Sequence, residues 1–159
     1  MMSRAQSRTQ LEQLLDEEIQ SSSRLLAALE RERDALRAGD MAALDEAGTQ
    51  KHSASSELQR LEAERSDLCR TFGHGQPAME QFIASCDSES VLMDRWRQLL
   101  DIWQVCQRAN DVNGRVVRQR RQQVQRALDL LRGDAAENSL YGPSGETAVQ
   151  DQAVCITTA

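Results

Sequence analysis

The sequence predicts an all-α protein, an elongated bundle of three long helices. Only 3% of the 159 residues are aromatic and two are prolines, and the alternation of Val, Ile and Thr that is typical of strands is absent. Apolar residues instead recur at alternating steps of three and four, as on one side of an α-helix. We expect an antiparallel hairpin, a short extra helix, a longer C-terminal helix and a disordered tail.

The first two helices are predicted over residues 5–38 and 41–72, each with an apolar seam. Between them, Gly39 offers the left-handed conformation that often ends a helix, and Asp40 is a favourable N-cap for the next one. A junction this short favours two antiparallel helices.

Breaks after the second helix separate it from the rest of the chain. Gly73 and Pro77 end it, and a short helix is predicted over residues 79–85. Asp87 or Ser88 is then the expected N-cap of the last long helix.

The last long helix is predicted to end near Arg132, with Gly133 closing it. It carries a heptad seam in which nine of twelve positions are apolar, a spacing that packs on other helices by knobs-into-holes. The seam consists of Leu92, Trp96, Leu99, Trp103, Cys106, Asn110, Asn113, Val117, Arg120, Val124, Ala127 and Leu131. We expect both Trp rings to point into the partner helix, each burying about 150–250 Å².

Two amides interrupt this seam. Buried amides without partners cost about 1–3 kcal/mol each, so Asn110 and Asn113 are expected to face one another, Arg33 or water. One interpretation is a polar layer that sets the helix register. The other is a weak point where the helix bends or the bundle ends.

Helix lengths indicate which part of the chain lacks a partner. At 1.5 Å per residue, the last helix is roughly 15 Å longer than the first. If Leu92 packs near Leu11 and Leu15, parallel pairing brings Asn113 alongside Leu36, and residues 117–131 extend beyond the hairpin turn. We expect residues 1–132 to form the bundle and residues 133–159, which contain no Lys or Arg, to form a flexible tail.

Apolar residues beyond the turn would form an exposed stripe, a mark of an interaction site. The stripe consists of Val117, Val124, Ala127, Leu128 and Leu131. An amphipathic helix of another protein would fit it. Self-association into a homodimer is the alternative, and periodicity does not separate the two.

Charge and composition exclude other classes of function. The net charge of −6 disfavours nucleic acid or an anionic membrane as the main partner. An arginine-rich stretch over residues 115–126 lacks the interleaved aromatics of a single-strand nucleic-acid groove and better suits an acidic partner. No apolar run is long enough to insert into a membrane, and residues 1–10 are too polar for a signal peptide, so we expect a cytosolic protein.

The sequence offers no chemistry for catalysis. Nothing in it resembles a nucleophile with its base, a phosphate loop or a metal cluster, so we expect no enzyme activity and no cofactor. The cysteines form no Cys-x-x-Cys pair and are interpreted as buried or free thiols; they are Cys69, Cys86, Cys106 and Cys155. Cys106 lies on the seam and is expected to pack as a small apolar residue.

Three pieces of the chain resemble the FlgN-type flagellar export chaperones. They are the run Ala-Asn-Asp-Val-Asn-Gly-Arg at 109–115, the Arg/Gln-rich helix ending in Leu-Asp-Leu-Leu at 128–131, and Leu-Tyr-Gly-Pro-Ser-Gly at 140–145. The Ala-Gly-Asp junction at 38–40 also follows the family's pattern. The resemblance implies a cytosolic chaperone that binds flagellar hook-associated proteins, prevents their premature assembly and delivers them to the export gate at the membrane.

The same resemblance implies roles for individual residues. The family engages the helical C-terminal region of its cargo through its own C-terminal part, so the stripe residues become candidate cargo contacts. Tyr141 becomes a candidate docking residue for the export gate or the cargo. The competing hypothesis is a homodimeric coiled-coil adaptor without a role in export.

Overall fold

A computed structural model describes residues 4–72, 79–86 and 90–138. These residues form four helices and no strand: α1 (Arg4–Ala38), α2 (Met41–Phe72), α3 (Met79–Cys86) and α4 (Val91–Asn138). The predicted all-α class and the order of the helices are confirmed. The chain divides into two compact units, Met1–Val117 and Arg118–Ala159, called the first and second unit below.

The junction between α1 and α2 has the predicted capping chemistry. Gly39 has a φ of 71°, and the amide of Asp40 donates to the carbonyl of Ala35 at 3.1 Å, the long bond of a Schellman C-cap. The Asp40 carboxylate then accepts from the amide of Ala43 at 3.0 Å, which makes it the N-cap of α2. The hairpin prediction is therefore confirmed.

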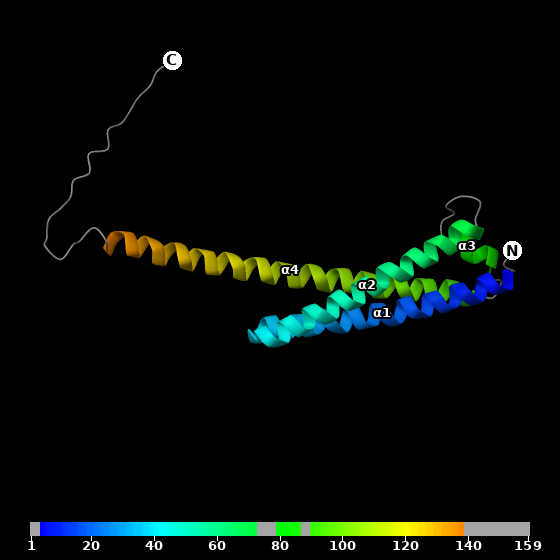
Figure 1. The fold of residues 1–159 in the computed structure, drawn as a ribbon, viewed down its shortest axis with the longest axis horizontal. Helices are drawn as coiled ribbons and strands as arrows, with labels where there is room; N and C mark the ends of the chain where they lie inside the picture. The colour runs from blue at the N-terminus through cyan, green and yellow to red at the C-terminus, as the bar shows by residue number, and fades with distance from the viewer. Residues whose placement is uncertain (1–3, 73–78, 87–89, 139–159) are drawn as a thin grey trace, which may run out of the picture. The chain divides into compact units, whose positions relative to one another are not determined.

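α1 and α2 pack as an antiparallel pair (Figure 1). Two ion pairs fix their register, Glu32 with Lys51 and Glu18 with Arg65. Towards the turn both helices bury alanines, which are Ala28, Ala35, Ala47 and Ala54. Small side chains at a contact let helix axes approach closely, so this part of the hairpin is narrow.

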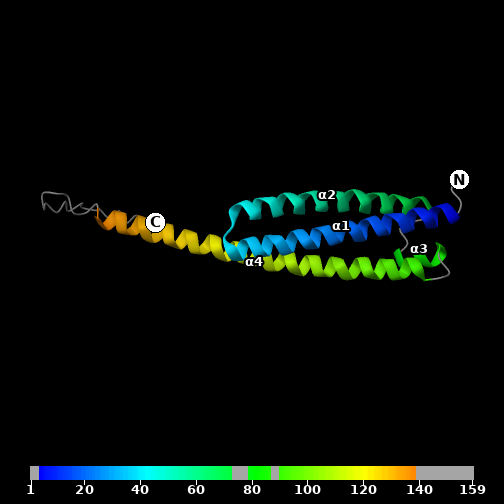
Figure 2. The ribbon, with the colours of Figure 1, turned by 90° about the horizontal axis from the view of Figure 1, so that it is seen from below.

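In the first unit α4 runs parallel to α1, which lies between α2 and α4 (Figure 2). The Cys106 thiol donates to the carbonyl of Ser22 at 3.5 Å, and the Asn113 amide donates to the carbonyl of Leu29 at 2.8 Å. The expected register, with Asn113 alongside Leu36, is therefore wrong by seven residues. In the observed register Val117 lies alongside α1 and not beyond the turn. Helix length alone does not predict which carbonyl of α1 accepts the hydrogen bond from Asn113, and that bond fixes the register.

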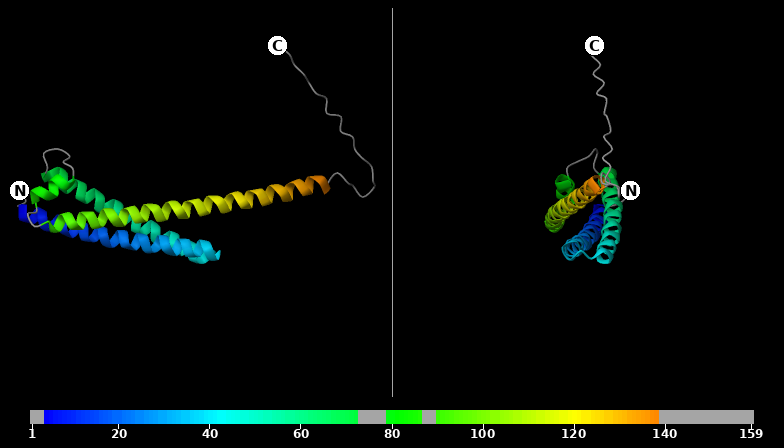
Figure 3. Two further views of the ribbon diagram at one scale, coloured as in Figure 1. Left: turned by 180° about the vertical axis from the view of Figure 1, so that it is seen from behind. Right: turned by 90° about the vertical axis from the view of Figure 1, so that its left-hand side faces the viewer.

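An apolar cluster of buried residues lies at the end of the hairpin away from the Gly39-Asp40 turn, beside α3 (Figure 3). Phe82 and Ile83 of α3 are buried there. Their neighbours come from all three long helices and include Leu11, Leu15, Leu61, Leu68, Leu92 and Leu99. α3 thus closes one end of the core.

The heptad seam of α4 is buried at every second position of its first half. Leu92, Leu99, Cys106 and Asn113 are buried, which confirms the expected burial of Cys106. The alternate seam positions, Trp96, Trp103 and Asn110, are not buried as predicted. They face the space between α2 and α4 and not α1. Trp103 is 46% exposed, Trp96 is half-buried and Asn110 is exposed. The Asn113 amide bonds to Leu29 and Glu32 and not to Asn110.

The ends of α3 and α4 differ from the prediction. α3 continues to Cys86, and α4 continues through Gly133 to Asn138. One glycine costs a helix only about 1 kcal/mol, and Gly133 has no positive φ. Ser90 occupies the N-cap position of α4, where its carbonyl accepts from the amide of Asp94.

Several predicted features lie outside the described residues. They are the breaks at 73–77, the proposed caps Asp87 and Ser88, and residues 139–159 with Tyr141 and Cys155. Within the described ranges, no helix is long and apolar enough to cross a membrane.

Candidate functional site

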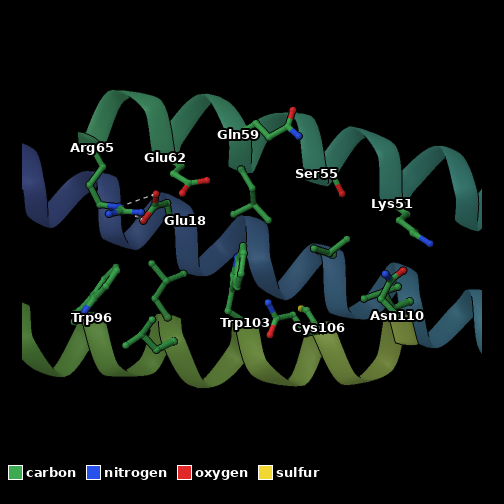
Figure 4. A pocket seen from close by; sticks show the side chains of 16 residues that line it. Glu18, Lys51, Ser55, Gln59, Glu62, Arg65, Trp96, Trp103, Cys106 and Asn110 are labelled. Atoms are coloured by element: carbon green, nitrogen blue, oxygen red, sulfur yellow. Dashed lines mark hydrogen bonds and ion pairs between the residues drawn. The ribbon is translucent and has the colours of Figure 1, made fainter. Parts of the chain in front are cut away.

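An open groove of about 400 Å³ lies in the first unit between α2 and α4, with α1 behind it (Figure 4). Its apolar lining comes from α1, α2 and α4 and comprises Leu25, Leu29, Leu58, Leu99, Leu100, Trp96, Trp103 and Cys106. The α2 wall adds polar side chains such as Ser55 and Gln59. The groove exists because α2 and α4 both pack on α1.

A buried ion pair closes one end of the groove. The Arg65 Nε donates to both carboxylate oxygens of Glu18, at 3.0 and 2.9 Å, and the guanidinium lies 5.0 Å from the ring centroid of Trp96. Burial raises the pKa of the Glu18 carboxyl, and the opposing attraction of Arg65 does not cancel that effect. This arrangement joins α1, α2 and α4.

A second polar cluster joins the same three helices at the other end. Glu32 of α1 accepts from Lys51 of α2 at 3.0 Å and from the Asn113 amide of α4 at 2.7 Å. Asn113 was expected to face Asn110, Arg33 or water, and the partner that the structure shows is the carboxylate of Glu32. The amide carbonyl of Asn113 has no hydrogen-bond partner among the described residues.

The buried thiols offer little reactivity. Burial raises the pKa of Cys69 and of Cys106, and the thiolate is the nucleophilic form of cysteine. Among the residues with described positions, no cluster of His, Cys, Asp or Glu could hold a metal ion.

The second unit presents an apolar surface on α4. Val124 is 59%, Leu128 42% and Leu131 65% exposed, and Ala127 is exposed as well. Steps of three and four residues put these side chains on one face of the helix. The fifth stripe residue, Val117, is 46% exposed and belongs to the first unit.

The same stretch of α4 is rich in arginine. Residues 118–132 contain five arginines and a single acid, Asp129, whose carboxylate accepts from Gln125. All of these arginines are exposed, and none forms an ion pair within the described part of the chain. The surface is therefore apolar and locally basic on a chain with a net charge of −6.

Sequence reasoning identified the stripe but missed the groove. The groove depends on Trp103 and Leu100 facing α2 across an open space, and a heptad pattern assigns such residues to a packed seam. A signal was available in the adjacent pair Leu99 and Leu100, because two neighbouring leucines cannot both face α1.

Comparison with known proteins places the chain in a family. A family model described as FlgN protein matches residues 1–148. The chain belongs to the FlgN family. FlgN proteins are flagellar export chaperones and not a family of enzymes. No significant match was found among curated proteins, and none among solved structures.

Proposed function

We propose that this FlgN-family chain captures flagellar hook-associated proteins in the cytosol and delivers them to the export gate at the membrane. The observation that carries the proposal is the exposure of Val124, Leu128 and Leu131 on one face of α4. A helix that is apolar along one face stabilises itself by covering that face with another helix.

The mechanism is steric protection of the client. A subunit that polymerises through an amphipathic terminal helix loses its assembly surface when that helix packs on the stripe. Release at the gate exposes the helix again. We assign docking at the gate, or a second contact with the cargo, to Tyr141.

The energy available from the stripe limits what it can do alone. Four or five buried aliphatic side chains contribute about 1.5–3 kcal/mol each, and micromolar binding requires about 8 kcal/mol. Association itself consumes part of that gain. Polar contacts beside the stripe are therefore needed for tight capture.

Light scattering with and without a purified hook-associated subunit tests this proposal. We expect the chain to bind the subunit in a complex of defined mass. The alternative is a homodimeric coiled-coil adaptor that uses the same stripe for its own partner helix. A homodimer whose mass does not change when the subunit is added would support that alternative and contradict export chaperoning.

A further inference from the structure

Two arginines lie within the apolar face of the second unit, not on its far side. Arg120 and Arg121 precede Val124 by four and three residues, a spacing that places them on the same helix face one turn away. Arg121 also precedes Leu128 by seven residues, two helical turns. Both arginines are exposed.

Neither arginine has a counter-charge in this part of the molecule. Within the described residues they form no ion pair, and Asp129 lies eight residues or more away along the helix. By contrast, Arg65 and Lys51 of the first unit are each paired with a glutamate. Arg120 and Arg121 are therefore available to a partner.

A helix that covers Val124 and continues by one turn also covers these two guanidinium groups. Burying a charge without a partner is strongly unfavourable. A carboxylate removes that penalty, because it accepts two parallel hydrogen bonds from one guanidinium group. The apolar contact and the acidic contact are thus required of the same partner.

We propose that the partner of this face is an amphipathic helix with an acidic end. Its apolar side chains contact Val124, Leu128 and Leu131, and carboxylates about one turn from the first of them contact Arg120 and Arg121. The inference rests on the proposed function for the existence of a client helix, and it adds the chemistry by which that helix is selected.

Nucleic acid fits this face less well. Phosphates would pair with the arginines, but they would leave the aliphatic side chains exposed. Residues 118–132 also contain no aromatic side chain on which a base could stack. A protein helix with carboxylates satisfies both parts of the surface.

Three synthetic helical peptides test the inference on the full chain. They share one leucine face and differ at two positions one turn before it, which carry Glu, Gln or Lys. At about 50 mM NaCl, where charges are weakly screened, we expect the Glu peptide to bind about tenfold more tightly than the Gln peptide. The Lys peptide binds most weakly, and about 300 mM NaCl reduces the differences.

Matched variants locate the effect. Arg120→Gln with Arg121→Gln removes the preference for the Glu peptide by weakening the binding of that peptide, and it does not weaken the binding of the Gln peptide, since only the charge contact is lost. Arg126→Gln is the control, because residue 126 follows Val124 by two positions and lies on the opposite side of the helix. This variant retains the preference.

Several results would overturn the inference. Equal affinities of the three peptides, absence of binding by all of them, or an equal effect of Arg126→Gln would each do so. Displacement of the Glu peptide by a short DNA duplex at physiological salt would assign the arginines to nucleic acid. If the Glu preference holds while no hook-associated subunit binds, the proposed function fails and the acidic-partner inference stands.

Discussion

Arg65 and Glu18 form a buried ion pair between α2 and α1, with the Arg65 Nε 2.9 Å from a carboxylate oxygen of Glu18. Their side chains are only 12% and 3% exposed. Because the Arg65 guanidinium also lies over the ring of Trp96, one side chain contacts a residue of each other long helix. The pair is a structural centre of the first unit and borders the groove.

Removing one partner of this pair should destabilise the first unit strongly. Arg65→Met leaves the buried Glu18 carboxylate without its cation, for which the expected loss is about 3–5 kcal/mol. Urea unfolding followed by circular dichroism measures it. Replacing both residues, as Glu18→Leu with Arg65→Met, should recover most of the loss.

The control is an ion pair at the surface. Arg37 and Asp34 lie 3.8 Å apart and are about three-quarters exposed, and exposed pairs contribute little. Arg37→Met should leave the urea midpoint nearly unchanged. A similar loss in both variants would mean that burial of the Arg65–Glu18 pair has no special consequence.

Glu18 should also give the protein a specific pH dependence. Burial raises its pKa above the usual 4.5, so the folded state holds this proton more tightly than the unfolded state. The resulting stabilisation is complete below pH 4.5 and is lost as the pH rises through the folded pKa. Relative to Glu18→Gln, which does not titrate, the free energy of unfolding should therefore fall as the pH rises.

Urea titrations of the native chain and of Glu18→Gln, at pH values from below 4.5 upward, supply the comparison. If the free energy of unfolding of the native chain instead rose with pH relative to Glu18→Gln, attraction by Arg65 would dominate over burial.

Trp103 and Leu99 should differ in their contribution to stability. Leu99 is 5% exposed and Trp103 is 46% exposed. Leu99→Ala should cost about 2–5 kcal/mol, whereas Trp103→Ala should cost roughly 1–2 kcal/mol because half of the ring is already in water. Thermal unfolding of the two variants decides between the groove and a fully packed seam, in which the Trp substitution would cost at least as much.

Asn113 should discriminate between an apolar and an acidic replacement. Its amide donates to Glu32, so Asn113→Asp brings two carboxylates together in a buried position, whereas Asn113→Leu removes only the hydrogen bonds. At neutral pH we expect Asn113→Asp to be less stable than Asn113→Leu by about 1–3 kcal/mol. The difference in free energy of unfolding between the two variants should decrease in acid as the carboxylates take up protons. A difference that does not depend on pH would contradict this account.

Local signals predicted most of the fold. Gly39 and Asp40 carry the backbone preferences that end one helix and begin the next, and the structure has both caps. The bounds of α2 were predicted from such helix-capping and helix-breaking residues. Gly133 was a misleading signal, since a glycine with helical neighbours and no required positive φ remains helical.

Relations between helices were harder to predict. The heptad pattern placed Leu92, Leu99 and Cys106 on the buried side, but it could not show that α4 meets α1 along a single line. The register depends on the hydrogen bonds of Asn113, which no periodicity encodes. The groove beside Trp103 therefore came only from the three-dimensional arrangement, whereas the exposed residues Val124, Leu128 and Leu131 were indicated by pattern and length.

The exposed face of α4 is proposed to bind the client and to contribute little to the fold. Val124→Asp with Leu128→Asp tests it against Gln119→Asp with Gln122→Asp, which adds the same charges on the opposite side of the helix. The measurement is the affinity for a hook-associated subunit by calorimetry, with the melting temperature of each variant recorded alongside. We predict that the first pair abolishes binding, that the control pair retains it, and that both melt close to the native chain. Retained binding in the first pair, or loss of its fold, would contradict the account.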